Sequence, residues 1–457
     1  MQERRELSPT KINQDLLRFA FHTPLWFWIA AIVLGCIFGA GLVSFILMLI
    51  FGLTLLGYTN IQLWGILITN FVFWVGISHA GVMISAILRL TQAEWRRPVT
   101  RAAEVLTVFA LATAATFPLI HTGRPWRVPY WVFPYDFGRG IFPDVRSALI
   151  WDPSAIFTYL SSSAMFIYVA LVPDLAIARD QSTGWRRQLY GLLALGFRGT
   201  ARQWKLQTIA GILLSGLILP VFVSVHSIVS WDFAMAITPG WHSSTFPPYF
   251  VIGAVHSGVS AVATLMAILR WIFHLEDYIT PDHFDALGRL LLVVVNTWLF
   301  FFLLDMVFGI GTRDPNELAI WELRIFQQPF NVLFPVFFIT GYIIPMGFWV
   351  FKKVRRNIKI MFWTSLIANV GMWLERYIII VPAVSDKRPF TFTWIPVYQV
   401  QPIEVILVLA SFALVSLGVL LFAKFFPIIP LFDIKEGQVL KQEIQVGRVR
   451  VPGIIRE

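Results

Sequence analysis

The sequence predicts an all-α polytopic membrane protein with about ten transmembrane helices. Hydrophobic residues make up 57% of the 457-residue chain and charged residues only 14%, whereas a soluble domain carries about 25% charged residues. Apolar runs recur from Leu25 to Phe426 without a long polar interval. Each run is close to the roughly 20 residues that cross a bilayer as a helix. We therefore expect one membrane domain over 25–426 between tails at 1–24 and 427–457.

Ten of these runs are long enough to span a membrane. The first run follows mainly polar residues and is too long for the core of a cleavable signal peptide, so we expect it to be retained. The predicted spans are 25–51, 62–88, 103–121, 154–178, 206–230, 248–273, 287–310, 329–351, 357–382 and 401–426.

The distribution of Lys and Arg predicts the direction of the spans. When the loops are assigned alternately to two sides, 27 of the 36 basic residues fall on the side of the N-terminus and 9 on the other. Under the positive-inside rule both termini are cytoplasmic, in the cell (inner) membrane. The net charge of +10 therefore reflects topology, and we expect lipid rather than nucleic acid as the partner of this surface.

Cysteine and histidine usage limits the redox chemistry of the chain itself. The single cysteine, Cys36, excludes a disulfide, a cysteine-ligated iron-sulfur cluster and a CxxCH haem attachment. Only His79, His226 and His256 lie well within spans, too few for the two histidine pairs of a dihaem protein. We expect no haem, iron-sulfur cluster or metal site in this chain, so any metal centres would belong to partner subunits.

A short motif occurs twice. Span two contains GISHAG at 76–81 and span six contains GAVHSG at 253–258, so both carry G-x-x-H-x-G. Both spans run inwards, which predicts a parallel repeat of two four-helix bundles, repeat one at about 62–230 and repeat two at about 248–382, with peripheral first and last helices. The alternative is that small residues coincide because they are common where membrane helices approach closely.

Ionisable side chains gather at the expected outer ends of the spans. Such residues are costly in a membrane and by default mark a functional pathway. A quinol releases two protons and two electrons, so its site needs a base near each ring oxygen and apolar walls. His121 has a suitable intrinsic pKa for a base, and Asp152 would orient the imidazole and receive the other proton. The aromatic residues that would wall the ring are Trp126, Tyr130, Trp131, Phe133 and Tyr135. An aromatic belt at the membrane interface predicts the same residues.

A second polar group lies deeper in the membrane. It contains His79, His226 and His256, with Asp174 and Glu104 nearer the cytoplasm. Protonatable groups at several depths suit a proton path, and we expect His79 and His256 to serve it rather than the quinol site. The alternative is that each histidine forms a hydrogen bond to a neighbouring helix.

Five stretches together resemble the NrfD/PsrC family of quinone-interacting membrane subunits. They are SHAG at 78–81, RLTQAEWRR at 89–97, HTGRPW at 121–126, RSALIWD at 146–152 and GWHS at 240–243. With ten spans and this length, the chain is most similar to the ActC-type subunit of alternative complex III. The resemblance covers nearly the whole membrane region, and its most specific parts are the segments around His121 and Asp152.

The resemblance implies a menaquinol-oxidising subunit with an iron-sulfur subunit on its periplasmic face. Electrons would pass on to multihaem c-type cytochrome subunits, and a paralogous NrfD-like membrane subunit would belong to the same complex. His121 and Asp152 match the quinol-site positions of the family. Residues placed nearby as further members of the site are Asp232, Arg376, Arg124 and Trp126.

Other functions stay open at this stage. The chain also fits an ActF-type paralogue that acts in proton translocation or structure, or a purely structural anchor. Buried charges and repeats occur in secondary transporters too, but those favour Pro or Gly at matching positions of the two halves. Pro220 lies in span five and its counterpart Pro345 in span eight rather than span nine, which counts against a transporter.

The first testable prediction concerns topology. Because the basic residues divide so unequally, reporter fusions at Arg198 and Lys353 should give cytoplasmic signals, and fusions at Arg139 and Pro239 periplasmic signals. Paired phosphatase and fluorescent-protein fusions measure this directly. Reversed signals at two of the four positions would contradict the ten-span topology.

Overall fold

The computed structural model of the chain describes residues 7–58, 62, 64–127, 148–385, 398–439, 442–446 and 449–453. Within them, ten helices are long and apolar enough to cross a membrane. This confirms the predicted fold class and number of spans. Arg139 and the aromatic residues Tyr130, Trp131, Phe133 and Tyr135 lie outside the described residues.

Several of the ten spans are built from more than one helical segment. Span two is α3 (Ile66–Val82), a π-helical turn (Met83–Ile87) and α4 (Leu88–Leu90); span three is α5 (Thr100–Ala114) and α6 (Phe117–His121). Span eight is α14 (Phe330–Phe338), a π-helical turn (Ile339–Ile343) and α15 (Ile344–Trp349). The single-helix spans are α2 (Leu25–Phe51), α8 (Ala148–Asp180), α10 (Ala201–Ala234), α11 (Phe246–Phe273), α12 (Pro281–Gly311), α17 (Ile358–Ser385) and α18 (Pro402–Phe425).

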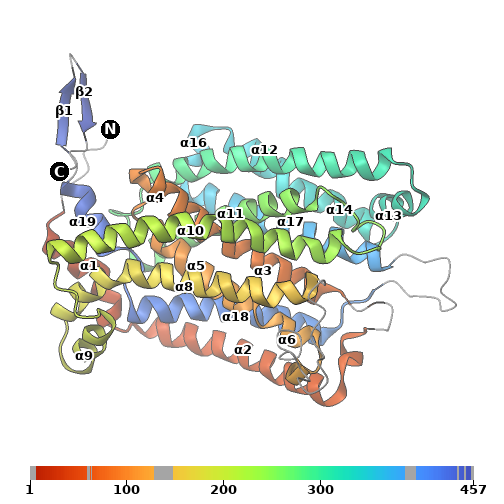
Figure 1. Cartoon of the computed structure of the whole chain (residues 1–457), viewed down its shortest axis with the longest axis horizontal. Helices are drawn as coiled ribbons and strands as arrows, with labels where there is room; N and C mark the ends of the chain where they lie inside the picture. Colours follow the sequence, from red (N-terminus) through yellow and green to blue (C-terminus); the bar gives the residue numbers. More distant parts are fainter. Residues whose placement is uncertain are drawn as a thin grey trace, which may run out of the picture.

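Shorter elements occupy the two ends of the bundle (Figure 1). The helices α1 (Pro9–Phe21), α9 (Gly184–Leu193), α16 (Lys352–Arg355) and α19 (Leu431–Val439) lie at one end, here called the terminal end, and α13 (Pro315–Phe326) lies at the other, the far end. An antiparallel hairpin of β1 (Gln442–Val446) and β2 (Val449–Gly453) follows α19. The ranges expected to be tails, 1–24 and 427–457, therefore contain secondary structure.

The spans pack as two groups of four. The helices α3, α5, α8 and α10 contact one another and form bundle one, whereas α11, α12, α14–α15 and α17 form bundle two. The groups meet mainly where α3 lies against α11, and α2 and α18 pack together outside them. These contacts support the predicted repeat, which stays a prediction.

Small residues allow α3 and α11 to approach closely. Gly76 faces Ala254 and Ser257, while Gly258 faces Ala80. A Cβ atom built on Gly258 would lie only 2.8 Å from the Ala80 Cβ and 2.9 Å from its backbone nitrogen. Each helix thus carries two small residues four positions apart, the spacing that lets membrane helices pack backbone against backbone.

Helix capping extends several spans beyond their apolar parts. The Thr200 hydroxyl accepts a hydrogen bond from the Gln203 N–H, and the Gln203 side chain accepts one from the Thr200 N–H, each at 3.3 Å. This capping box starts α10 five residues before the predicted apolar run. Similarly, α12 begins at Pro281, a residue type whose fixed φ suits the first turn of a helix.

A glycine substitution at the α3–α11 contact tests this packing. Gly258→Ala should lower the free energy of unfolding by about 1–3 kcal/mol, because the added methyl group overpacks a backbone contact. Gly216→Ala is the matched control, since a Cβ built there meets nothing within 4 Å among the described residues. Thermal unfolding of the detergent-solubilised protein measures both variants, and equal midpoints would contradict the close approach.

Candidate functional site

Two aspartates meet at the far end of bundle one. Asp152 lies near the start of α8 and Asp232 near the end of α10, and these helices pack along their lengths. A side-chain hydrogen bond links the two carboxyl groups, and Oδ1 of each has no partner within the described ranges. A hydrogen bond between two carboxyl groups requires a proton on one of them, because carboxylate oxygens only accept hydrogen bonds. The pair is thus able to accept or release a proton.

The second far-end group is His121, the last residue of α6. Its ring forms a hydrogen bond with the Leu67 backbone, and its Nε2 is buried without a partner among the residues that the structure describes. The ring centroids of Phe71 and Phe117 lie 6.1 Å and 5.9 Å from that of His121. A neutral imidazole that donates one N–H to a carbonyl leaves its other nitrogen as an acceptor. His121 is therefore an apolar-walled position for a proton acceptor.

Not all of the predicted far-end residues come together. Asp152 is bonded to Asp232, and the described part of the chain shows no hydrogen bond or ion pair between Asp152 and His121. Arg124 and Trp126 are exposed in the turn after α6, with 61% of Trp126 accessible. Their membership of a site therefore stays a prediction.

Arg376 lies instead in the interior of bundle two. It forms an ion pair with Glu375, and both residues are only 1% exposed. Trp298 Nε1 donates a 2.7 Å hydrogen bond to Glu375, and the guanidinium stacks over the Phe250 ring at 5.2 Å. The guanidinium also fills the space beside Gly253, where a Cβ would lie 2.7 Å from Nη2. Neither Trp298 nor Glu375 was among the site residues predicted from the sequence.

The three membrane histidines lie within electrostatic reach of this arginine. Arg376 acts electrostatically on His79, His226 and His256, all of which are fully buried. The His79 and His226 ring centroids are 4.7 Å apart. His256 packs between the rings of Trp298 and Trp349, and neither of its nitrogens has a hydrogen-bond partner in the described part of the chain.

His79 has a distinctive hydrogen-bonding environment. Nδ1 lies 2.5 Å from the Val75 carbonyl oxygen and Nε2 lies 2.9 Å from the Phe222 carbonyl oxygen. Carbonyl oxygens only accept hydrogen bonds, and a neutral imidazole has a single N–H to donate. Both contacts become hydrogen bonds only when His79 carries a second proton. The neutral ring therefore donates to one carbonyl at a time, and its tautomer decides which.

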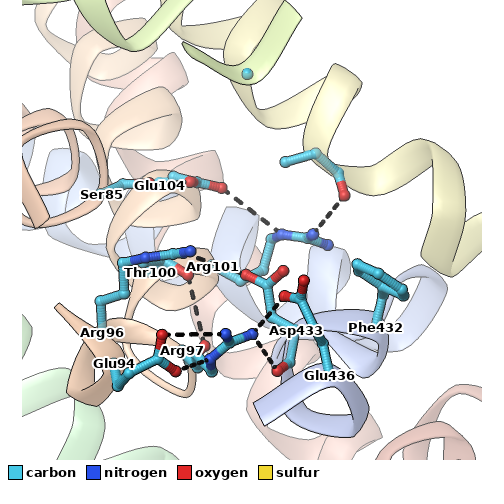
Figure 2. Close-up of polar contacts among 12 residues, drawn as sticks. Ser85, Glu94, Arg96, Arg97, Thr100, Arg101, Glu104, Phe432, Asp433 and Glu436 are labelled. Carbon is cyan, nitrogen blue, oxygen red and sulfur yellow. Dashed lines mark hydrogen bonds and ion pairs between the residues drawn. The ribbon is translucent and has the colours of Figure 1, made fainter. Parts of the chain in front are cut away.

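The predicted acidic pair near the terminal end is joined by an arginine. Arg101 Nη2 donates to Asp174 at 3.1 Å, and Arg101 Nε lies 3.6 Å from Glu104. Ser85 donates a further hydrogen bond to Glu104 (Figure 2). Sequence reasoning missed Arg101, although its position three residues before Glu104 on one helix was a usable signal.

Three polar groups lie between this acidic pair and His79. Thr107 is one turn from Glu104 on α5, and its hydroxyl donates a 2.7 Å hydrogen bond to the Ser78 carbonyl. The Tyr159 hydroxyl donates to the same carbonyl at 3.1 Å. Polar groups therefore lie one helical turn from Glu104 and at the residue beside His79. The described residues contain no group of three or more His, Cys, Asp or Glu that could hold a metal ion.

The buried ion pair makes a sharp stability prediction. Arg376→Gln should lower the free energy of unfolding by about 3–5 kcal/mol, because the Glu375 carboxylate stays buried without its cation. The double variant Glu375→Gln/Arg376→Gln should recover most of this loss, whereas Arg187→Gln at an exposed position of α9 should change little. Thermal unfolding of the single and double variants gives the coupling energy, and additive losses would contradict the pairing.

Most of the chain is similar to known proteins. A Halobacterium salinarum protein described as a membrane subunit of dimethyl sulfoxide reductase is 23% identical over 356 residues, covering 76% of this chain and 75% of that protein. A selenate reductase subunit from Mesobacillus selenatarsenatis is 21% identical over 358 residues, covering 77% of this chain and 81% of that protein. Residues 54–385 match the family described as polysulphide reductase, NrfD, which confirms the family predicted from the sequence. Because this match spans most of the chain, the protein belongs to the NrfD polysulphide reductase family.

Proposed function

We propose that this chain is a menaquinol-oxidising membrane subunit of an electron-transfer complex. One observation carries the proposal: proton acceptors without partners among the described residues lie at the far end of bundle one. They are Nε2 of His121 and the free carboxyl oxygens of the Asp152–Asp232 pair. Buried polar atoms are normally hydrogen-bonded, so those left unpaired are candidates for contact with a ligand.

The chemistry requires two acceptors. Oxidation of a quinol to a quinone releases two protons and two electrons. His121 Nε2 accepts the proton of one ring hydroxyl, while the carboxyl pair accepts the proton of the other. Phe71 and Phe117 supply an apolar wall beside His121, and Arg124 and Trp126 stand at the rim.

The two electrons leave through partner subunits. We propose an iron-sulfur subunit on the periplasmic face as the first acceptor, followed by multihaem c-type cytochrome subunits, with a paralogous NrfD-like membrane subunit alongside. This is the ActC-type arrangement of alternative complex III. The names of the two relatives favour a second arrangement, in which the same quinol oxidation supplies a reductase. The c-type haem content of the purified complex distinguishes the two arrangements.

We also propose that the inner polar groups form a proton path. Glu104 and Asp174 lie at its terminal end, and His79, His226 and His256 lie near Arg376. Polar groups at Thr107 and Ser78 continue from Glu104 towards His79. Proton translocation by an ActF-type paralogue would use the same groups without quinol oxidation at His121.

Two substitutions test the quinol site. His121→Ala and Asp152→Asn should each slow menaquinol oxidation by the assembled complex about 10²- to 10⁴-fold, the usual contribution of a general base. Neither change should prevent assembly, because each side chain lies near a helix end and Asp152→Asn keeps a hydrogen-bonding group beside Asp232. Steady-state oxidation of a menaquinol analogue measures the effect, with the cofactor content of the partners as the assembly check.

Matched controls are available on the terminal side. His22 and Asp180 are exposed, so His22→Ala and Asp180→Asn should leave turnover unchanged. Near-normal turnover in both test variants would show that this chain does not oxidise quinol at this site, and would favour the ActF-type paralogue.

A further inference from the structure

The helix α19 is fastened to the terminal end of bundle one by an arginine. Arg97 Nη1 donates to the Asp433 carbonyl at 2.8 Å and to Glu436 Oε2 at 2.6 Å (Figure 2). Its Nε donates to Glu94 at 2.6 Å. Burial opposes the charge of Arg97, but the hydrogen bonds to Glu94 and Glu436 outweigh burial and raise its pKa. Arg97 is therefore a fixed cation that holds α19.

The same helix reaches an acidic residue inside the membrane span. The Phe432 backbone N–H donates a 2.9 Å hydrogen bond to Asp174 Oδ1, while Arg101 contacts Asp174 Oδ2. The Phe432 ring stacks on Trp204 with centroids 4.1 Å apart. The start of α19 thus takes part directly in the Arg101–Asp174–Glu104 cluster.

A cavity of about 670 Å³ lies beside this cluster, and α19 forms part of its wall. One wall consists of Phe432, Asp433 and Glu436, and the other includes Arg101 and Asp174. A single water needs roughly 10–15 Å³ of such space, so the cavity is ample for many. Exposed residues on its rim, at the surface of the protein, are Leu90, Gln92 and Thr208.

Two arginines that line the cavity have buried nitrogen atoms without hydrogen-bond partners within the described part of the protein. Arg101 is 1% exposed, and its Nη1 forms no hydrogen bond with any described residue; Arg89 Nε is likewise unpartnered there. Buried donors of this kind are usually satisfied by ordered water. The lining arginines are balanced by a similar number of carboxyl groups, so the cavity does not select an anion. Water is the occupant that its chemistry fits.

We propose that this cavity is a hydrated vestibule that connects the cytoplasm with Asp174 and Glu104, and that α19 is its displaceable cover. The vestibule would be the cytoplasmic entrance of the proton path in the proposed function, and its role rests on that proposal. Protons reach Asp174 from vestibule water, and movement of α19 removes the Phe432 N–H from Asp174 while opening the vestibule. The cover lies outside residues 54–385, the part that matches the family.

The attachment of α19 depends on a small set of contacts, among them ion pairs of Arg97 with Glu436 and of Arg96 with Asp433. A helix of nine residues is below the roughly 12–15 residues at which isolated helices become marginally stable, and Gly437 lowers its helix propensity further. The Glu94 and Glu436 side chains are 43% and 41% exposed. Ion pairs with such exposed partners contribute little stability. Opening therefore costs little compared with unfolding the bundle.

Cysteine accessibility tests the cover. In a Cys36→Ser background, Thr100→Cys reports from the inner wall, where Thr100 is only 2% exposed, and Thr208→Cys reports from the open rim. A membrane-impermeant thiol reagent applied to the terminal side of membrane vesicles should label the rim cysteine much faster. Phe432→Ala/Glu436→Gln, which removes the ring stack and one ion pair, should accelerate labelling at position 100 by at least about tenfold, equivalent to 1.4 kcal/mol.

The matched control is Phe425→Ala/Glu276→Gln, which changes the same residue types at exposed positions on the same side. It should leave both labelling rates unchanged. The single variant Glu436→Gln gives a smaller acceleration and carries the test if the double variant does not assemble.

Two outcomes overturn the proposal. If the labelling rate at position 100 does not change when α19 is released, this helix is not a cover. Labelling at position 100 as fast as at position 208 in the otherwise unchanged protein shows that the inner wall is already open. Neither measurement needs quinol turnover, so failure of the quinol site through His121→Ala is distinguishable from failure of the cover.

Discussion

The close contact between α3 and α11 is the constraint on which the rest of the structure depends. Gly76 and Gly258 remove the side chains that would hold the two helices apart. Each of these helices is also a member of a different four-helix bundle. Their approach therefore sets the distance between the bundles and places His79 and His256 in one electrostatic environment, next to Arg376. Because the hydrocarbon core contains no water to solvate polar groups, the polar side chains of this interior need partners within the protein.

Some polar groups of the interior have partners within the protein, whereas others keep hydrogen-bond acceptors without a partner among the described residues. This difference distinguishes groups that stabilise the fold from groups suited to function. Glu375 and Arg376 form a buried ion pair with further support from Trp298, so their removal singly would leave an uncompensated charge. By contrast, His121 and the Asp152–Asp232 pair retain acceptors that no described protein group occupies. The first arrangement stabilises the fold, whereas the second is suited to a ligand that brings its own hydrogen-bond donors.

The spans were predictable because hydropathy directly measures the cost of placing a segment in lipid. The predicted span 25–51 coincides with α2, and 248–273 differs from α11 by two residues at its start. Larger differences occur where helices continue into water, as in α12, which begins six residues before the predicted 287–310. The short helices α1 and α19 escaped prediction because their stability depends on packing against the bundle. In α1, for instance, Ile12 is fully buried.

By itself the sequence determined the family, the ten spans and the residue types available for chemistry, because composition and local motifs are readable along the chain. Tertiary structure alone decided their partners. Asp152 and Asp232 are 80 positions apart, and only the packing of α8 on α10 joins them. Tertiary structure also decided the place of Arg376. The sequence suggested that it belongs to the outer site, but its guanidinium lies beside Gly253 on another helix and acts electrostatically on the histidines. Such pairings depend on which helices are neighbours and on their rotation, and neither property is encoded in the hydropathy of a single span.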